Sequence, residues 1–291
     1  MGVPLVIGDV IEDIQVKLLQ AIRPDTDTPA EIHRHMGGSA ANTAAWLAAD
    51  GSPVNFVGRV GASDVSSIAA DFAAAGVTAY LEPDHERPTG TIVMVVDGET
   101  RTMLTDRGAN IALDPDSIPR DVLEAASIVH LTGYSLFHHH QPELVAQLIS
   151  RATELGIPVM VDASSAGFLE DFGTTRFLDL VAGARVLRCN RDEALALAGE
   201  GDLARAAQAL AGRFPIVVVT DASRGSLIAQ GDTLVTVAAY PVEAVVDPTG
   251  AGDAFNAGLL AGLSSSQPIE EAAARAARLA AQAVSRWGAR P

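Results

Sequence analysis

The sequence feature that most constrains the fold is a regular alternation between short Val/Ile-rich runs and Ala/Leu-rich segments of helical period. The Val/Ile-rich runs predict core strands at residues 3–7, 54–60, 127–131, 158–161, 185–189 and 216–220. The Ala/Leu-rich segments predict helices at residues 40–49, 65–75, 142–155, 191–198, 203–213, 254–263 and 269–286. Strands and helices that take turns in this way favour an α/β fold with a doubly wound, mostly parallel sheet flanked by helices.

Two stretches interrupt this alternation. Residues 11–19 with 31–36, and residues 91–96 with 101–104, have the pattern of paired antiparallel strands, and the second pair turns at residues 97–99. The pairs form either a small antiparallel β lid, over about residues 11–36 and 89–105, or two ordinary edge hairpins. No internal repeat or obvious linker divides the chain, so we expect a single domain over residues 1–291.

Composition argues against several classes of function. Asp and Glu outnumber Lys and Arg by 36 to 20, and the net charge of −16 argues against a nucleic-acid or anionic-membrane surface. Lys17 is the only lysine, so the lysine-bearing P-loop of many nucleotide hydrolases cannot occur. The single cysteine, Cys189, cannot form an intramolecular disulfide and is expected to be a buried structural thiol. Residues 1–10 lack a signal-peptide pattern, and no apolar run approaches the roughly 20 residues of a membrane span, so we expect a cytoplasmic protein.

The most informative segment is residues 245–258, where a β-branched run leads through a glycine-rich turn into an Ala/Leu helix. Gly250 and Gly252 allow the backbone to approach a ligand closely, and the helix N-terminus that follows offers unpaired N–H groups to a phosphate. Asp253 stands beside this anion site and could accept the proton of an attacking hydroxyl in phosphoryl transfer. The alternative is that Asp253 only caps the helix.

Residues 247–253, Asp-Pro-Thr-Gly-Ala-Gly-Asp, and residues 37–44, Gly-Gly-Ser-Ala-Ala-Asn-Thr-Ala, resemble the two signatures of the ribokinase family, also called PfkB-type carbohydrate kinases. The resemblance spans nearly the whole chain. It implies a ribokinase-like fold and an ATP-dependent transfer of a phosphoryl group to a hydroxyl of a sugar-like substrate, with ATP and Mg²⁺ bound. It also implies that the antiparallel pairs form a lid, whose closure would exclude water from the reaction.

The resemblance assigns roles on the phosphate side of the site. Asp253 is the expected catalytic base, and the backbone at Gly250, Ala251 and Gly252 is the expected anion hole. The expected nucleotide-side residues are Asn190, Glu193, Thr220 and Gly225, with Glu193 reaching Mg²⁺ through water. Without the resemblance, Asn190 and Glu193 would be interpreted as a helix capping box. The positions that bind a monovalent cation in some family members are matched by Asp247, Thr249, Ser285 and Gly288, so K⁺ is a candidate activator.

On the substrate side, the resemblance assigns Asp13, Gly37, Gly38 and Asn42, and Arg101 and Asn110 are further candidate substrate-binding residues. Carboxylate and amide groups beside glycines suit a polyol, because they make several hydrogen bonds and admit close backbone contact. Two departures argue against ribokinase itself. Ser39 replaces the lysine usual in ribokinases, and residues 131–134 lack the carboxylate that ribokinases place near the sugar. In the nucleotide loop, Ala222 stands where the family usually has glycine.

The identity of the hydroxyl compound stays open at this level. Residues 9–42 and 89–110 contain no Phe, Tyr or Trp, which favours a sugar or sugar acid, such as ribose, fructose or a 2-keto-3-deoxy sugar acid, over a nucleoside. Phe137, Phe168 or Phe172 could still reach the pocket. Arg101 and Arg107 could recognise a carboxylate or a sugar phosphate, or could be solvated hairpin charges.

Three alternatives therefore accompany the sugar kinase: a nucleoside kinase, a sugar-phosphate kinase and a non-catalytic ligand sensor. Three consecutive histidines at residues 138–140 are expected to form a polar loop before a helix, because consecutive residues cannot all face one metal ion. The expected partners are a small sugar-like molecule and, through exposed lid strands, a second copy of the chain in a homodimer. No nucleic acid or membrane is expected as a partner.

Overall fold

The computed structural model describes residues 2–97 and 100–291, except for the side chain of Arg101. Its main sheet has nine strands in the order β13-β12-β11-β10-β9-β8-β1-β4-β5. The strands from β5 to β11 are parallel, and the β12–β13 hairpin adds two antiparallel strands at one edge. Their bounds are β1 Val3–Ile7, β4 Asn55–Gly61, β5 Thr78–Asp84, β8 Ala126–Thr132, β9 Val159–Asp162, β10 Val186–Asn190, β11 Ile216–Thr220, β12 Ser226–Gln230 and β13 Thr233–Val237. The six expected core strands and the mostly parallel sheet are thus confirmed.

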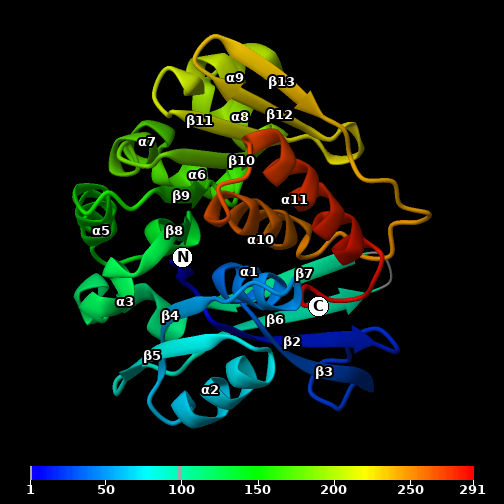
Figure 1. The fold of residues 1–291 in the computed structure, drawn as a ribbon. Coiled ribbons are helices and arrows are strands. Elements are labelled where there is room, and N and C mark those ends of the chain that lie inside the picture. Colours follow the sequence, from blue (N-terminus) through cyan, green and yellow to red (C-terminus); the bar gives the residue numbers. More distant parts are fainter. Residues whose placement is uncertain (1, 98–99) are drawn as a thin grey trace.

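Helices cover both faces of the main sheet (Figure 1). One face carries α3 Arg120–Glu124, α5 Pro142–Glu154, α7 Thr174–Leu180, α8 Arg191–Ala198 and α9 Leu203–Ala211. The other face carries α1 Ser39–Ala49, α2 Val65–Ala74, α10 Ala251–Ser264 and α11 Ile269–Val284. Two further short helices, α4 Tyr134–Phe137 and α6 Ala166–Phe172, follow the carboxyl ends of β8 and β9. The fold class is therefore the expected α/β arrangement of a mostly parallel sheet flanked by helices.

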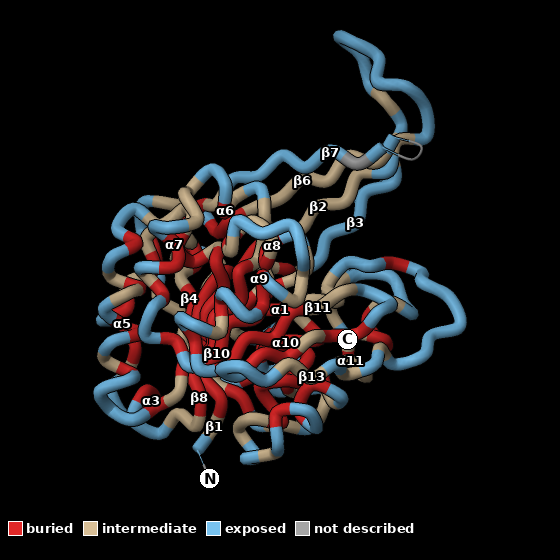
Figure 2. Tube along the Cα trace, turned by 90° about the horizontal axis from the view of Figure 1, so that it is seen from above, coloured by how far each residue is buried: buried red, intermediate tan, exposed pale blue. Residues whose placement is uncertain are grey.

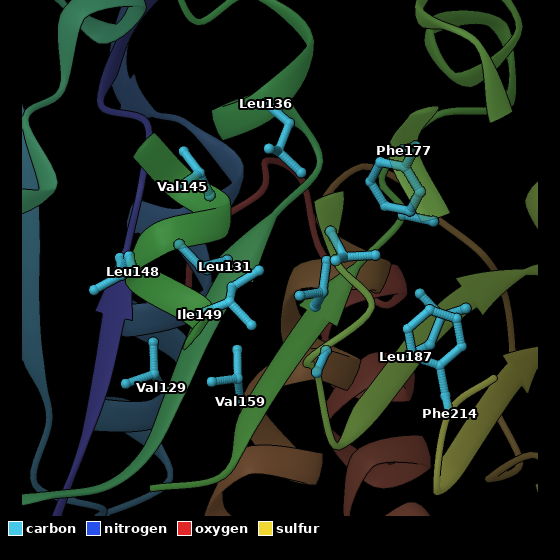
Figure 3. Close-up of a cluster of buried hydrophobic side chains, with 14 of the residues drawn as sticks. Val129, Leu131, Leu136, Val145, Leu148, Ile149, Val159, Phe177, Leu187 and Phe214 are labelled. Carbon is cyan, nitrogen blue, oxygen red and sulfur yellow. The ribbon is translucent and has the colours of Figure 1, made fainter. Parts of the chain in front are cut away.

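The core explains why the central strands are almost continuously apolar. Along β1, Leu5 and Ile7 belong to one buried cluster, whereas Val6 between them belongs to the cluster on the opposite face. Figure 3 shows part of the first cluster, where Val129 of β8 and Val159 of β9 lie close to side chains of α5. Strands covered on both faces need apolar residues at every position, which is why the Val/Ile-rich runs predicted them well.

A second, four-stranded sheet projects from the body of the molecule (Figure 2). Its strands are β2 Ile11–Leu18, β3 Ala30–Gly37, β6 Gly90–Asp97 and β7 Thr100–Asp106, in the order β3-β2-β6-β7. The expected antiparallel pairs β2–β3 and β6–β7 are both present, and a parallel β2–β6 pairing joins them into one sheet. The turn expected at residues 97–99 includes residues 98 and 99, which lie outside the described residues.

Two smaller expectations are also met. Cys189 is fully buried in β10, and residues 138–140 lie in the loop between α4 and α5. Among the described helices, none combines the length and apolarity needed to cross a membrane.

Candidate active site

The glycine turn leads into helix α10. Residues 238–250 form no regular helix or strand, and Gly250 is the N-cap of α10 with a left-handed φ of 77°. A side chain at Gly250 would also collide with Ala289, whose carbonyl oxygen lies 2.5 Å from the position a Cβ would take. Only glycine meets both constraints. The Ala251 N–H donates to the Pro248 carbonyl at 3.3 Å, so Ala251 takes part in closing the turn.

Asp253, in the first turn of α10, is held by two side chains of α1. Its Oδ1 accepts a hydrogen bond from Ser39 Oγ at 2.6 Å, and its Oδ2 accepts one from Asn42 Nδ2 at 3.0 Å. The carboxylate therefore faces α1 rather than capping its own helix. Burial raises the pKa of Asp253 to about 7, and the charges of Asp162 and Asp9 add to this, whereas the bonds from Ser39 and Asn42 oppose it. A carboxyl group with a pKa near 7 suits a general base.

The start of α1 is fixed by Asp9, which follows β1. The Asp9 carboxylate accepts hydrogen bonds from the backbone N–H groups of Ser39 and Ala40, each at 3.0 Å. Gly38 precedes them with a φ of 98°, and a side chain there would collide with the Asp9 carbonyl. Asp9 thus caps α1 and aims Ser39 and Asn42 at the catalytic carboxylate. Sequence reasoning gave Asp9 no role.

The expected substrate patch comes together beside this carboxylate. Asp13 of β2 lies across from the end of β3, and any side chain at Gly37 would collide with its carboxylate. Burial and the charge of Asp9 raise the pKa of Asp13 to about 6, against the lowering effect of Arg290. Asn110 bonds only to backbone: its side chain pairs with Val10 N and O, each at 2.9 Å, and with the Arg107 carbonyl. Asn110 therefore ties the segment after β7 to the chain between β1 and β2.

Arg290 enters this patch from the other end of the sequence, and sequence reasoning missed it. Its Nε donates to Asn42 Oδ1 at 3.1 Å, and its Nη2 donates to the Gly37 carbonyl at 3.5 Å. A guanidinium cannot accept a hydrogen bond, so the oxygen of the Asn42 amide must face Arg290 and its NH₂ must face Asp253. Arg290 thereby fixes the orientation of one of the two donors to the carboxylate.

A buried ionic network lies directly behind the glycine turn. Arg188 of β10 donates from Nη1 to both carboxylate oxygens of Asp162, at 3.1 and 3.2 Å, and from Nη2 to Thr220 Oγ1 at 3.0 Å. Asn256 of α10 donates to the same carboxylate at 2.6 Å. The Arg188 Nη1 atom is 3.3 Å from where a Cβ on Gly252 would lie. A permanent positive charge therefore touches the turn, although the sequence had suggested only a strand residue.

The expected nucleotide-side pair forms a complete capping box at the start of α8. Asn190 Oδ1 accepts from Glu193 N at 2.9 Å, and Glu193 Oε2 accepts from Asn190 N at 2.7 Å. Glu193 is only 1% exposed. Burial, followed by repulsion from Asp162, raises its pKa to about 7. The capping geometry is thus confirmed, and the metal-linked role of Glu193 stays a prediction.

The loop after β11 keeps its tight turn without the usual glycine. Ala222 takes a left-handed φ of 48°, and Gly225 follows with a φ of 93°. A side chain at Gly225 would collide with the Val237 carbonyl, so glycine is required there. At the end of β11, the Thr220 hydroxyl oxygen accepts a hydrogen bond from Arg188.

The candidate cation residues also gather in space. Asp247 Oδ1 accepts from Thr249 N at 3.0 Å and from Thr249 Oγ1 at 2.6 Å, and Asp247 Oδ2 accepts from Gly288 N at 3.3 Å. The Ser285 hydroxyl donates to the Ala281 carbonyl of its own helix at 2.8 Å. Within the described chain, no group of three or more His, Cys, Asp or Glu side chains gathers as a metal site.

Beside these residues lies a groove of about 810 Å³ between the segment after β13 and helix α11. It is lined by Tyr240, Pro241, Val242, Arg278, Ala281, Gln282, Ser285 and Arg286. The backbone N–H groups of Val246 and Asp247 both donate to the Val284 carbonyl. The segment that carries Asp247 is therefore bonded to the residue next to Ser285, which lines the groove.

The sequence matches a known family over almost its whole length. The model of the pfkB family carbohydrate kinases matches residues 4–291. The chain belongs to the pfkB family of carbohydrate kinases.

Relatives of this pfkB kinase act on different compounds. The chain is 31% identical to a protein described as an uncharacterised sugar kinase of Archaeoglobus fulgidus, over 81% of this chain and 92% of that protein. It is 29% identical to the bifunctional protein HldE of Azorhizobium caulinodans over 97% of its own length, but spans only 61% of that protein. Among solved structures, adenosine kinase from Sinorhizobium meliloti superposes with a TM-score of 0.87 at 29% identity, covering 100% of this chain and 96% of that one.

Most of the expected pfkB site residues converge in the structure. Hydrogen bonds or close approaches connect Asp13, Gly37, Gly38, Asn42 and Asp253, and Asp247 joins Thr249 to Gly288. Arg101 lies in β7, with a side chain outside the described part of the chain. The missed residues are Asp162, Arg188, Asn256 and Arg290. A sequence signal existed for Asp162 and Arg188, since opposite charges in neighbouring buried parallel strands are expected to pair.

Proposed function

We propose that this chain transfers the γ-phosphoryl group of ATP to a hydroxyl of a sugar or sugar acid, with Asp253 as the general base. The observation that carries the proposal is the setting of Asp253. Its carboxylate follows a glycine turn at a helix N-terminus, accepts bonds from Ser39 and Asn42, and has a pKa raised to about 7. Such a group is ionised at slightly alkaline pH and can accept the proton of an attacking hydroxyl.

The residues around the turn complete the chemistry. Phosphoryl transfer needs positioning and charge stabilisation more than covalent participation by the protein. The backbone of Gly250, Ala251 and Gly252 would hold the transferring group at the start of α10, and Arg188 beside Gly252 would add positive charge. Asp13 and Asn42 would hold hydroxyls of the acceptor. Closure of the lid over this patch would exclude water, which competes as an acceptor.

The residues present fit Mg²⁺ and K⁺. Glu193 is buried near Asp162 with a raised pKa, so a hydrated divalent cation would relieve the repulsion between two carboxylates. Mg²⁺, when bound, would neutralise phosphate charge. Glu193, with Asn190, would hold its water ligands. Asp247, with the Thr249 and Gly288 backbone and the Ser285 carbonyl, would hold K⁺ at the other side of the turn.

The nucleotide base would occupy the groove between residues 240–242 and α11. The groove has room for it, at about 810 Å³, and adjoins the cation residues. Thr220 and Gly225 lie at and just after the carboxyl end of β11, where ligands of open α/β sheets bind.

The experiment is a measurement of ADP release by purified protein with Mg-ATP and K⁺. The acceptor panel contains sugars, sugar acids, sugar phosphates and nucleosides. We expect turnover with a sugar-type acceptor, and a loss of about 10²–10⁴-fold in kcat for Asp253→Asn with acceptor binding retained. Turnover of nucleosides alone would overturn the choice of substrate. An Asp253→Asn variant with near-normal kcat would overturn the base, and no acceptor-dependent ADP would favour a ligand sensor.

We also propose that the chain forms a homodimer through the lid. The outer strands of the second sheet, β3 and β7, expose Ile32, Met103 and Leu104, each 59% accessible. Exposed apolar side chains on edge strands favour pairing with another sheet. Light scattering coupled to size-exclusion chromatography tests this, because a monomer of 30.1 kDa at micromolar concentration would contradict it. The cytoplasmic location stays a prediction.

A further inference from the structure

A group of hydrogen-bond donors without protein acceptors lies between the lid and the end of β8. The Arg107 guanidinium carbon is 4.9 Å from the centre of the Tyr134 ring and 5.7 Å from that of Phe168. Throughout the described residues, this guanidinium has no hydrogen bond or ion pair. The ring of His138 packs edge-on against Phe168 at 4.8 Å, and its buried Nε2 atom also lacks a partner. We call Arg107, Tyr134 and His138 the donor cluster.

The donor cluster faces the substrate patch. Asn110 bonds to the Arg107 carbonyl and to both polar backbone atoms of Val10, which anchors the arginine beside the residues leading into β2. After burial, the charge of Asp9 contributes most to raising the pKa of Tyr134, and Asp253 adds to it. The phenol is therefore close to the catalytic carboxylate and remains protonated, so it can donate.

Ordinary surface packing does not account for Arg107. The chain offers a matched comparison in Arg176, which stacks over Phe172 at 4.6 Å. Arg176 also forms an ion pair with Glu143 at 3.1 Å. Arg107 has the same stacking but no carboxylate partner, in a chain where acidic residues outnumber basic ones by 36 to 20. A half-buried guanidinium needs acceptors, and none of the described residues supplies them to Arg107.

The neighbouring segment cannot supply an acceptor carboxylate either. Residues 131–140, which include β8's end, α4 and the three histidines, contain no Asp or Glu. Burial, and then the positive charge of Arg107, lowers the pKa of His138, so its imidazole is neutral and carries one ring N–H. The cluster thus presents a cation, a phenol and an imidazole, all able to donate at neutral pH.

We propose that the donor cluster binds an acidic group of the acceptor substrate, either the carboxylate of a sugar acid or the phosphate of a sugar phosphate. Arg107 would donate to two oxygens of this group, and His138 and Tyr134 would donate to the same two oxygens of a carboxylate or also to the third terminal oxygen of a phosphate. Asp13, Asn42 and Asp253 would accept from or orient the hydroxyls at the other end of the acceptor. The substrate is then a polyhydroxy anion, and this assignment rests on the proposed kinase function.

The test compares matched acceptors that differ only in the acidic group: gluconate against sorbitol, and ribose 5-phosphate against ribose. We expect kcat/KM to be higher for the acidic member of one pair, which identifies carboxylate or phosphate. Arg107→Met is expected to lower the ratio of acidic to neutral kcat/KM by about 10–100-fold, mainly through KM, as for a lost charge-assisted bond. Arg107→Lys keeps the charge but loses the paired N–H donors of the guanidinium, so its ratio of acidic to neutral kcat/KM is expected to lie between those of the wild type and Arg107→Met. Arg176→Met, the matched control, should leave the ratio unchanged.

Binding gives a second readout that does not depend on turnover. The acidic acceptor should raise the Tm of the wild-type protein and raise it less for Arg107→Met, while the Tm without ligand shows that the variant is folded. Preference for the neutral member in both pairs, or an equal loss for both members in Arg107→Met, would overturn the donor cluster while leaving the kinase intact. Absence of turnover with every acceptor would instead overturn the proposed function.

Discussion

Replacing Asp253 with asparagine is expected to stabilise the fold while it lowers kcat by about 10²–10⁴-fold. The side chain lies in a mostly buried position, close to the charges of Asp162 and Asp9, and within the described residues its hydrogen-bond donors are Ser39 and Asn42. A negative charge in such a place is kept for function at a cost in stability. Asparagine has the same shape and no charge, so it removes this cost.

The magnitude follows from the raised pKa. Asp253 titrates at about 7 in the folded chain instead of its ordinary 3.8. Between these values the unfolded chain has lost the proton while the folded chain keeps it, so stability falls by about 1.4 kcal/mol per pH unit as pH rises. Complete conversion would give about 4 kcal/mol above pH 7. Residual solvent access, and the weaker hydrogen bonds that a neutral amide makes with Ser39 and Asn42, reduce the expected gain to about 2 kcal/mol.

Urea unfolding of wild type and Asp253→Asn at pH 5, 6, 7 and 8 measures this gain. The difference in free energy of unfolding should be less than half of its full size at pH 5, rise through pH 6 and 7, and reach its full size near pH 8. Asp171→Asn, an exposed aspartate, is the control and should show no pH-dependent gain. Equal stability of the wild type and Asp253→Asn at pH 8, or a gain that does not change with pH, would refute the assignment of a destabilising buried negative charge to Asp253.

Three further variants test the surroundings of the turn. Arg188→Met breaks a buried ion pair and should cost about 3–5 kcal/mol in unfolding free energy, whereas Arg213→Met, which breaks an exposed pair, should cost at most about 1 kcal/mol; similar losses in urea titrations would contradict the buried network. Gly250→Ala should lower both Tm and kcat more than Gly199→Ala, because both have left-handed φ values but only Gly250 also lacks space for a side chain. Ser39→Ala removes a bond that lowers the pKa of the base, so the acid limb of the pH profile of kcat/KM should move to higher pH, and an unmoved limb would argue against this bond.

The sequence predicted the central strands because burial on both faces leaves a continuous apolar run. It missed β5, where Glu82 and Pro83 interrupt the apolar pattern, and such a strand is tolerated because it lies at the sheet edge. It also missed the β12–β13 hairpin, although Gly231-Asp232 between two short apolar runs is a two-residue hairpin signal. The short helices α6 and α7 carry too few turns for a periodic pattern.

The candidate site was predictable where one short segment supplies both the backbone that can bind a phosphate and the side chain that can accept a proton. Residues 250–253 combine glycines, a helix N-terminus and a carboxylate, and the structure keeps them together. Residues that act through partners far along the chain gave no such signal. From its own segment, Arg188 is predicted only as a strand residue, and its ion pair requires knowing that Asp162 lies on the adjacent strand. From its own segment, Arg107 is predicted only as a charge near a hairpin, and its role requires knowing that it stacks over the Tyr134 ring.

Asp253 depends on contacts that join both ends of the chain, which explains why its environment could not be derived from its own segment. Ser39 and Asn42 lie more than 200 residues before it, and Arg290, which orients Asn42, lies after it. The segment that carries Arg290 also packs its Ala289 carbonyl against Gly250. The dipeptide Ala289-Arg290 therefore contacts both Gly250 of the glycine turn and Asn42, which donates to the Asp253 carboxylate. A displacement of this stretch would disturb the phosphate side and the acceptor side together, so substitutions there should lower kcat more than they raise KM for either substrate.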